Sequence, residues 1–468
     1  MSAVPQSSSL QPAVFELFVP GRLCIFGEHS DWAGAMRKYN HTLTPGRTIV
    51  VGTEQGLHAH VAALAEPVLR LHSTRDDGTS LEIELPLEAS ALAQEAQRGG
   101  FWSYAAGTAY RLLVDFGVGG LAIDNHKTTL PLKKGLSSSA ALCVLVARAF
   151  NRAYGLKLTT RGEMQYAYEG ERMTPSQCGK MDQACAFGRT PVLMTYDGDV
   201  LGVQGAAVGA ALHLVLVDLA ASKDTVIILE QLQAAFPHPA TQEQRECVEL
   251  LGPINADVTQ RAVQLMAAGD VVALGALMTE AQAHFTARAA PLCPSQLTSP
   301  VLHSVLSHPP IQQHVYGGKG VGSQGDGTAQ LLCRDAAAQA EVCRIITQDF
   351  GMHCMPFTVP PTPGCNGAAA ASQAGAAAAN SQATAAAAAT APEDANAIRA
   401  NGTESIQATS DSSNGAGGLQ QQLVQALQCV KRKQAELAFA QLRLKEIEAA
   451  VQAAGAQHTG LVTAVECI

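Results

Sequence analysis

The stretch from Pro131 to Ala141 combines glycine, two lysines and three serines at the start of a helical pattern. It reads Pro-Leu-Lys-Lys-Gly-Leu-Ser-Ser-Ser-Ala-Ala, follows a strand-like run at Leu121 to Asn125, and leads into an apolar helix. A helix start leaves about four backbone amides without partners and carries about half a positive charge, so phosphate oxygens can bind there. A serine hydroxyl at that point can reach a Mg²⁺ ion, although serine is also an ordinary helix N-cap. Both interpretations remain open, whereas a Walker A loop is excluded by its missing Gly-Lys-Ser/Thr.

Two further stretches place carboxylates and a cation close together. Residues 28–31, Glu-His-Ser-Asp, follow two apolar runs that predict short strands at 15–19 and 23–26, with a turn at Pro20. Acceptors this dense at a strand end suit a polyhydroxylated ligand, or they form a solvated turn. Farther on, Asp182 stands two residues from Lys180, and a carboxylate kept ionised by a cation can take a hydroxyl proton. A helix N-terminal aspartate is the alternative for Asp182.

A glycine-rich stretch, Gly317 to Gly327, is the last of these candidates. Its glycines allow the backbone to approach a phosphate closely, and Lys319 adds positive charge. Asp326 would repel a phosphate unless its side chain points away or holds a metal.

Together these stretches resemble the three motifs of the GHMP kinases, the family named for galactokinase, homoserine kinase, mevalonate kinase and phosphomevalonate kinase. The resemblance covers roughly residues 14 to 356 and includes Pro20 to Gly34, the serine stretch and the glycine-rich stretch. Cys178-Gly-Lys-Met-Asp-Gln183 is similar to the Cys-Gly-Ile-Met-Asp-Gln of galactokinases, and Lys180 is its one departure. The family's usual Gly-x-Gly-Gly run is replaced by Ser323-Gln-Gly-Asp-Gly327.

The resemblance implies a role for each matching residue. Asp182 would be the catalytic base, with Arg22 and Lys180 as the other catalytic residues, and Arg22 would lie beside the transferred phosphate. Glu28, His29 and Asp31 would hold sugar hydroxyls, and Asp31 favours a sugar because mevalonate-kinase-like members lack that aspartate.

The same resemblance implies ATP and Mg²⁺ as cofactors. ATP would lie between the serine stretch and the glycine-rich stretch, and Mg²⁺ would be held by Ser139 with Glu171, although Glu169 lies as close in spacing. The residues expected to bind ATP are Lys134, Gly135, Leu136, Ser137, Ser138, Ser139, Ala140, Gly318, Lys319, Gly322 and Gly325.

The elements expected around these motifs give an α+β chain. Periodicity predicts a helix at 102–116, strands at 48–52, 81–85, 212–219 and 354–359, and helices at 226–235, 243–251 and 262–284. The resemblance implies a two-domain GHMP kinase fold, with a ribosomal protein S5 domain 2-like domain at 1–207 and a ferredoxin-like domain at 208–360.

The remaining residues have a different composition. Residues 361–418 are dominated by small and polar residues, which predicts a disordered low-complexity linker. Apolar residues recur every seven positions from Leu423 to Val451, which predicts a helix within 419–468 that packs on the body or self-associates.

Composition limits the function classes. With 31 basic and 40 acidic residues the net charge is −9, and no basic block is present, which argues against a nucleic-acid partner. No apolar run of about 18 residues lacks a charge, so no membrane span is expected. The twelve cysteines lack Cys-x-x-Cys spacing, and the first 20 residues show no targeting signal, which predicts a cytoplasmic protein.

We therefore expect an ATP-dependent kinase that phosphorylates a monosaccharide at its anomeric hydroxyl. Mevalonate kinase is the alternative enzyme. A non-catalytic sugar sensor on a kinase scaffold is the alternative from another class, because the third motif is unusual and a terminal helix follows it.

Overall fold

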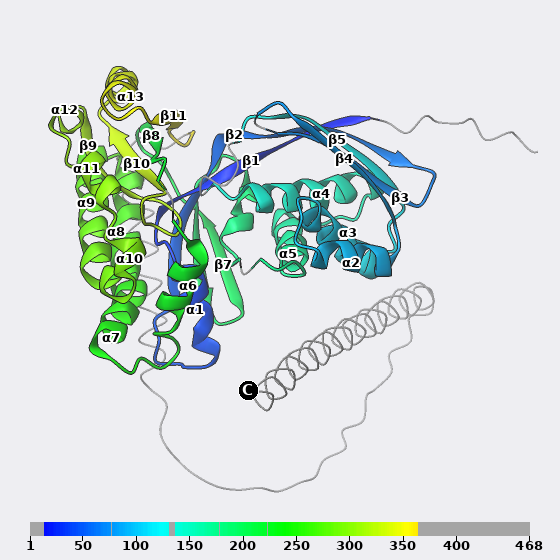
Figure 1. Ribbon diagram of the computed structural model, residues 1–468, viewed down its shortest axis with the longest axis horizontal. Coiled ribbons are helices and arrows are strands. Elements are labelled where there is room, and N and C mark those ends of the chain that lie inside the picture. Colours follow the sequence, from blue (N-terminus) through cyan, green and yellow to red (C-terminus); the bar gives the residue numbers. More distant parts are fainter. Residues whose placement is uncertain (1–13, 76, 131–135, 177, 222, 364–468) are drawn as a thin grey trace, which may run out of the picture.

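A computed structural model describes residues 14–75, 77–130, 136–176, 178–221 and 223–363. Two β-sheets organise this part of the chain, one from β1 to β7 and one from β8 to β11 (Figure 1). The first sheet ends at Gly205 and the second begins at Leu212, on either side of the expected boundary at 207/208, which stays a prediction. Lys134 and Gly135, the linker from residue 364 onward and the helix expected within 419–468 lie outside the described residues.

The first sheet is built around one long strand, β2. β1 pairs with it along one edge, and β5 and β6 share its other edge, in the overall order β4-β3-β5-β2-β6-β7. The strands are β1 (Phe15–Phe26), β2 (Gly46–Leu64), β3 (Val68–Thr74), β4 (Ser80–Pro86), β5 (Gly120–Thr128), β6 (Val192–Asp197) and β7 (Val200–Gly205).

Four helices cover one face of this sheet (Figure 1). They are α2 (Ala89–Gln97), α3 (Ser103–Phe116), α4 (Ser138–Tyr154) and α5 (Thr160–Glu171). α4 contacts β1, β2, α3 and α5, and its Val144, Leu145 and Phe150 have no exposed surface. A helix that is apolar around most of its circumference is buried, and the serines lie at the start of this buried helix.

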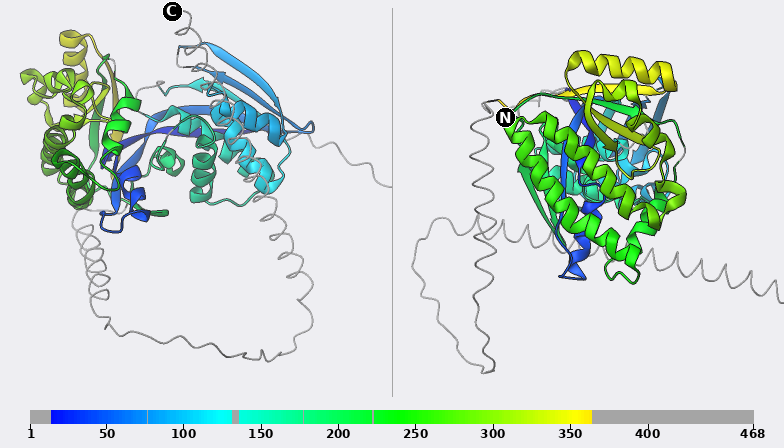
Figure 2. Two further views of the ribbon diagram at one scale, coloured as in Figure 1. Left: turned by 60° about the horizontal axis from the view of Figure 1, so that its bottom comes forward. Right: turned by 90° about the vertical axis from the view of Figure 1, so that its left-hand side faces the viewer.

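The second sheet has the strand order β11-β8-β10-β9, all antiparallel. Its strands are β8 (Leu212–Asp218), β9 (Val315–Gly320), β10 (Thr328–Cys333) and β11 (His353–Val359). With helices between β8 and β9 and between β10 and β11, this is the βαββαβ arrangement of ferredoxin-like folds, as the resemblance implied. α13 (Ala336–Phe350) lies along one side, and α8 (Asn255–Ala268) and α9 (Val271–Arg288) lie along the other (Figure 2).

Short elements complete the described part. They are α1 (Ser30–Ala35), α6 (Thr225–Gln233), α7 (Gln242–Glu249), α10 (Pro294–Leu297), α11 (Pro300–Leu306), α12 (Pro309–Gln312), the 3₁₀ segments η1 (Met36–Lys38), η2 (Asp182–Phe187) and η4 (Ala290–Leu292), and the π turn η3 (Leu250–Ile254). None of the helices among the described residues has the length and hydropathy of a membrane span.

Two expectations about these elements were wrong. The runs at 15–19 and 23–26 form one strand, β1, because a register shift between Pro20 and Arg22 absorbs the proline without ending the pairing with β2. The helix expected at 262–284 is two helices, because Gly269 adopts a left-handed φ of 73° and the Asp270 side chain caps a new helix by accepting from the Ala273 amide.

Candidate active site

Asp182 and Arg22 meet at the start of α4. The Arg22 guanidinium forms an ion pair with Asp182 Oδ1, and the Ser137 hydroxyl donates to the same oxygen at 2.9 Å. Arg22 comes from β1 and Asp182 opens η2, so two segments far apart in sequence build the pair. The Arg22 side chain is 6% exposed and that of Asp182 25%, so the carboxylate is the more accessible member. These two contacts of Asp182 are with side chains, whereas a helix cap binds backbone amides.

The hydroxyls of Ser137 and Ser139 bind carboxylates rather than the backbone amides of α4. Ser137 occupies the N-cap position with a left-handed φ of 55°, and its side chain makes no capping hydrogen bond. Ser139 donates to Glu171 Oε1 at 2.7 Å. The two hydroxyls thus reach two different carboxylates beside the amides of the first turn of α4, where Ser138 and Ala140 also lie.

Glu171, at the end of α5, is the glutamate that faces the serines. It is 1% exposed, and its second oxygen accepts from Gln183 Nε2 at 2.7 Å. Burial first, and then the charge of Asp182, raise the pKa of Glu171 to about 7. Glu169 instead pairs with Arg111 at 2.8 Å, away from the serines.

A divalent cation fits the oxygens of Ser139 and Glu171. Mg²⁺ prefers hard oxygen ligands, and here a hydroxyl and a buried carboxylate are already in contact. A cation at this point would favour the ionised form of Glu171, which burial alone disfavours. The residues present are therefore consistent with the expected Mg²⁺ site.

Asp31 lies beside the same group of residues. It is 6% exposed, and a Cβ atom at Gly179 would come within 1.7 Å of its Oδ2, so only glycine allows this approach. Burial, followed by the charge of Asp182, raises the pKa of Asp31 to about 6. The negative charge of Asp182 therefore acts on the Asp31 carboxyl.

His29 is held as a neutral imidazole. Its Nδ1 accepts from Trp32 Nε1 at 3.2 Å, and its ring stacks on Phe285 with centroids 6.0 Å apart. Burial lowers the pKa of His29 to about 4. Because Nδ1 is the acceptor, the ring hydrogen is on Nε2, which makes His29 a hydrogen-bond donor.

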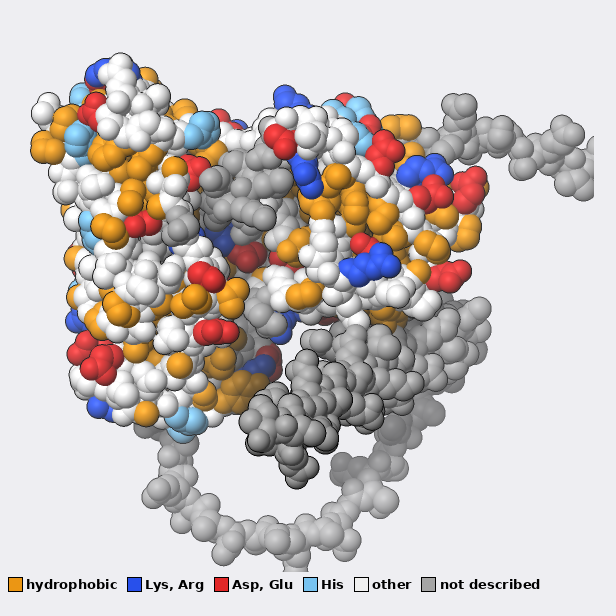
Figure 3. Space-filling model, viewed as in Figure 1, with side chains coloured by type: hydrophobic (Ala, Val, Ile, Leu, Met, Phe, Trp, Pro, Cys, Tyr) orange, Lys and Arg blue, Asp and Glu red, His pale blue; other side chains and the backbone are white. Residues whose placement is uncertain are grey.

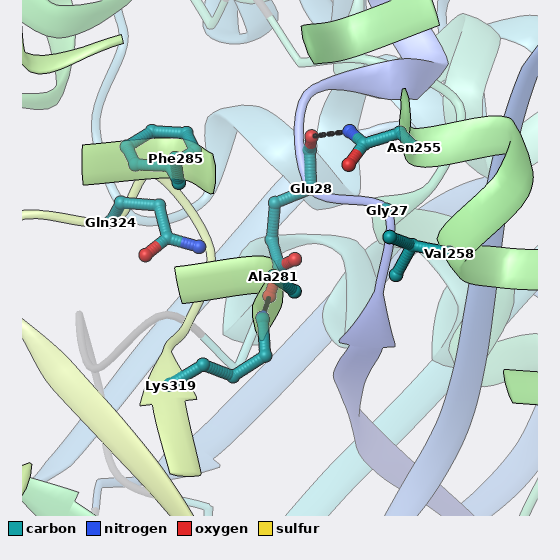
Figure 4. Close-up of a pocket in the computed structure, with 8 residues that line it drawn as sticks. All are labelled: Gly27, Glu28, Asn255, Val258, Ala281, Phe285, Lys319 and Gln324. Atoms are coloured by element: carbon teal, nitrogen blue, oxygen red, sulfur yellow. Dashed lines mark hydrogen bonds and ion pairs between the residues drawn. The ribbon is translucent and has the colours of Figure 1, made fainter. Parts of the chain in front are cut away.

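Glu28 and Lys319 occupy positions that the sequence did not predict. They form a fully buried ion pair that joins the end of β1 to β9, and Lys319 also donates to the Gly320 carbonyl at 2.9 Å. Figure 4 shows the pair in a small pocket with Asn255, whose amide donates to the Glu28 carbonyl at 3.3 Å. This placement argues against the expected contacts of Lys319 with phosphate and of Glu28 with a sugar hydroxyl.

The glycine-rich stretch divides into a strand and a loop. Gly318 lies within β9, whereas Gly322 and Gly325 lie in the loop after it with left-handed φ values of 67° and 69°. Asp326 accepts from the Leu302 amide at 2.8 Å, so its side chain points toward the start of α11.

Lys223 is a residue that sequence reasoning missed. Its Nζ donates to the Gln324 carbonyl at 3.0 Å and would lie 2.3 Å from a Cβ atom at Gly327. Burial, and then the charge of Arg22, lower the pKa of Lys223 to about 8. No spacing or motif marks this lysine, because it reaches the site only through the folding of the glycine-rich loop.

Two other expected residues are placed as follows. Lys180 Nζ lies 5.3 Å from the centroid of the Tyr168 ring, and the cation beside Asp182 is Arg22. A catalytic part for Lys180 stays a prediction. Leu136 is buried and its carbonyl accepts from the Arg22 amide at 3.1 Å, which ties the serine stretch to β1.

In the space-filling view, basic and acidic side chains gather in a hollow between the two halves (Figure 3).

Comparisons with known proteins agree with this architecture. Residues 103–189, which include Ser137, Glu171 and Asp182, match the family model of the GHMP kinases N terminal domain. A galactokinase of Thermococcus kodakarensis is 28% identical over 192 residues, or 40% of this chain; the match spans about half, 48%, of that relative.

Solved structures extend the likeness to both sheets. The galactokinase of Lactococcus lactis, complexed with galactose, has a TM-score of 0.57 and 17% identity, covering 74% of this chain and 93% of its own. The L. major mevalonate kinase, in complex with R-mevalonate, has a TM-score of 0.54 and 17% identity, covering 76% and 99%. Residues 103–189 thus resemble the N-terminal domain of the GHMP kinases, and the two-sheet fold is that of galactokinase and mevalonate kinase structures.

Proposed function

We propose that this protein is an ATP-dependent kinase that phosphorylates a monosaccharide at its anomeric hydroxyl. The observation that carries the proposal is the arrangement around Asp182, which is held by Arg22 and Ser137 and has Asp31 beside it. Such a transfer requires a base, a cation and a second carboxylate that binds neighbouring hydroxyls.

Each residue of this arrangement has a part in the proposed reaction. Arg22 and Ser137 both bind Oδ1 of Asp182, which leaves Oδ2 to accept the proton of the sugar hydroxyl. Arg22 lies where it can stabilise charge on the transferred phosphoryl group. The phosphates of ATP would bind the amides at the start of α4 opposite the loop of Gly322 and Gly325, with Lys223 at its side.

Mg²⁺ would be held by Ser139 and Glu171 and would neutralise charge on the phosphates of ATP. Gln183 holds the second oxygen of Glu171, so one carboxylate oxygen is positioned by the protein and the other is in contact with Ser139.

Asp31 and His29 support a sugar as the acceptor. A buried carboxylate and a neutral imidazole donor can each bind one hydroxyl, and mevalonate offers fewer hydroxyls to satisfy them. The fold does not choose between these acceptors, because the likeness to galactokinase and to mevalonate kinase is similar in extent. We place the reaction in the cytoplasm, where the nine free cysteines of the described residues would stay reduced.

The test is ATP turnover across a panel of monosaccharides and mevalonate, with ³¹P NMR of the product. We expect one sugar to stimulate turnover and to yield a sugar 1-phosphate, and Asp182→Asn to lower the stimulated turnover by roughly 10²–10⁴. Turnover of mevalonate would replace the proposal with mevalonate kinase. Sugar binding without turnover would replace it with a sensor.

A further inference from the structure

The face of the first sheet that carries no helices holds a row of alternating acids and histidines. Glu16 on β1 lies opposite His60 on β2, His60 opposite Asp124 on β5, Asp124 opposite His72 on β3, and His72 opposite Glu82 on β4. Residues opposite one another on the same face of a sheet have neighbouring side chains. The row therefore crosses five strands on the side away from α2 to α5.

A register shift brings a further histidine into this row. The pairing of β2 with β5 is irregular between His58 and His60, where β5 has one extra residue. His126 then lies over His60, with ring centroids 4.3 Å apart and ring planes 18° apart. In the space-filling view, histidine and acidic side chains gather at the upper edge of the molecule, over these strands (Figure 3).

Three of these side chains are close enough to share one ion. One ligand atom from each of His60, Asp124 and His126 lies within 4.8 Å of the others. Asp124 has a second partner, because its Oδ1 lies 2.6 Å from His72 Nδ1. His60 Nε2 lies 3.3 Å from Glu16 Oε1.

We propose that His60, His126 and Asp124 bind a divalent transition-metal ion of the zinc class. Two imidazoles and one carboxylate are ligands that suit Zn²⁺, Cu²⁺ or Ni²⁺, whereas Mg²⁺ prefers oxygen ligands in octahedral geometry. His72 is the positioning residue that orients Asp124, as outer hydrogen bonds to metal ligands commonly do. A water molecule completes four-coordination, and Glu16 faces His60 Nε2, on the opposite side of the ring from Nδ1, which faces Asp124.

This site is separate from the proposed Mg²⁺ site. Ser139 belongs to α4, on the helix-covered side of the sheet, whereas His60 and Asp124 belong to the opposite face. The ion would clip β2 to β5. An ion that binds the folded chain alone raises its stability by mass action.

The experiment uses the full chain and Zn²⁺ alone as the probe. Binding is measured by calorimetry with Mg²⁺ in excess, and Tm is measured with and without Zn²⁺. The test variant is His60→Ala with His126→Ala, and His126→Ala alone is a milder variant at an exposed position. The control is His308→Ala, because His308 pairs with Asp349 at 2.8 Å but belongs to no three-ligand group among the described residues.

We expect one equivalent of Zn²⁺ to bind the parent and to raise its Tm, and the control to behave like the parent. The double variant should lose this equivalent, and His72→Ala should weaken binding by about 10–100-fold. The cysteines are the same in all variants, so any zinc they bind does not alter the comparison. Equal Zn²⁺ affinity in the parent and in folded His126→Ala, or an equal loss in the control, would overturn the proposal.

Discussion

Arg22 and Asp182 are 160 positions apart and form an ion pair in which the guanidinium is almost fully buried. The pair fixes one carboxylate oxygen and joins β1 to the start of η2. It also links the proposed catalysis to stability, because losing the carboxylate removes an anionic partner from a buried guanidinium.

Asp182→Asn should therefore affect both properties. The amide cannot take a hydroxyl proton, so turnover per folded molecule should fall by roughly 10²–10⁴. Stability should also fall, by about 1–3 kcal/mol, because Arg22 and Ser137 lose a charged acceptor. Turnover is to be compared at equal folded fraction, measured by thermal unfolding. The control is Asp326→Asn, which changes the carboxylate that accepts from the Leu302 amide. Parental turnover in folded Asp182→Asn would remove Asp182 from the mechanism.

Changing Ser137 and Ser139 separately to alanine should alter two different properties of the proposed enzyme. Ser139→Ala removes a hydroxyl from the proposed Mg²⁺ site, so the Mg²⁺ concentration for half-maximal turnover should rise by on the order of 10-fold. Ser137→Ala removes a donor to Asp182 and should lower kcat with little change in that concentration. A Mg²⁺ titration of both variants measures the difference. The same response in both would mean that the serines act only on the start of α4.

The sequence predicted the place of this site better than its internal contacts. Asp182, Arg22 and the serine stretch were identified because they are local motifs, and the structure brings them together. The sequence spacing could not show whether Glu171 or Glu169 binds the metal. Residues two apart on a helix point in different directions, and only the fold shows that Glu171 is the one that reaches Ser139.

The sequence could not predict which side chains of the two sheets contact each other. Lys319 was assigned to phosphate and Glu28 to a sugar, yet β9 and β1 bring them into one buried ion pair. Lys223 was missed for the same reason, because its position depends on the path of the glycine-rich loop. The ferredoxin-like arrangement of the second sheet, by contrast, was expected from the family resemblance.

Asp31→Asn should weaken sugar binding while stabilising the protein at neutral pH. The pKa of Asp31 is raised from 3.8 to about 6, so its contribution to stability is full below about pH 3.8 and is lost as pH rises through 6. An amide carries no such charge. At pH 7.5 the variant should be more stable by up to roughly 3 kcal/mol, and the difference should vanish near pH 4.

Sugar affinity of Asp31→Asn should fall by an amount equivalent to about 1–3 kcal/mol, with ATP affinity unchanged. Thermal unfolding between pH 4 and 7.5 and the KM values for sugar and ATP are the measurements. An equal rise in both KM values would contradict a sugar-binding part for Asp31.

Lys223 should limit activity at alkaline pH. Its pKa is lowered from 10.5 to about 8, so it loses its positive charge as pH rises through 8, and kcat/KM should then fall by about tenfold per pH unit. Lys223→Arg keeps the charge and should retain activity at higher pH, whereas Lys223→Gln should be impaired at every pH. A pH profile identical in the parent and in Lys223→Arg would show that another group causes the decline.

A chain that ends at Gly364 should keep the proposed kinase activity, because every proposed site residue lies before it. The position of the new C-terminus matters, because Thr362, which follows β11, is hydrogen-bonded to Val208, which precedes β8. The Thr362 amide donates to the Val208 carbonyl at 2.8 Å, and its hydroxyl accepts from the Val208 amide at 3.0 Å. A matched chain that ends at Val359 loses both hydrogen bonds and should be less stable by about 1–3 kcal/mol with similar turnover per folded molecule. Unfolding and turnover of the two shortened chains and the full chain are to be measured together. A folded but inactive chain ending at Gly364 would show that residues after 364 complete the site.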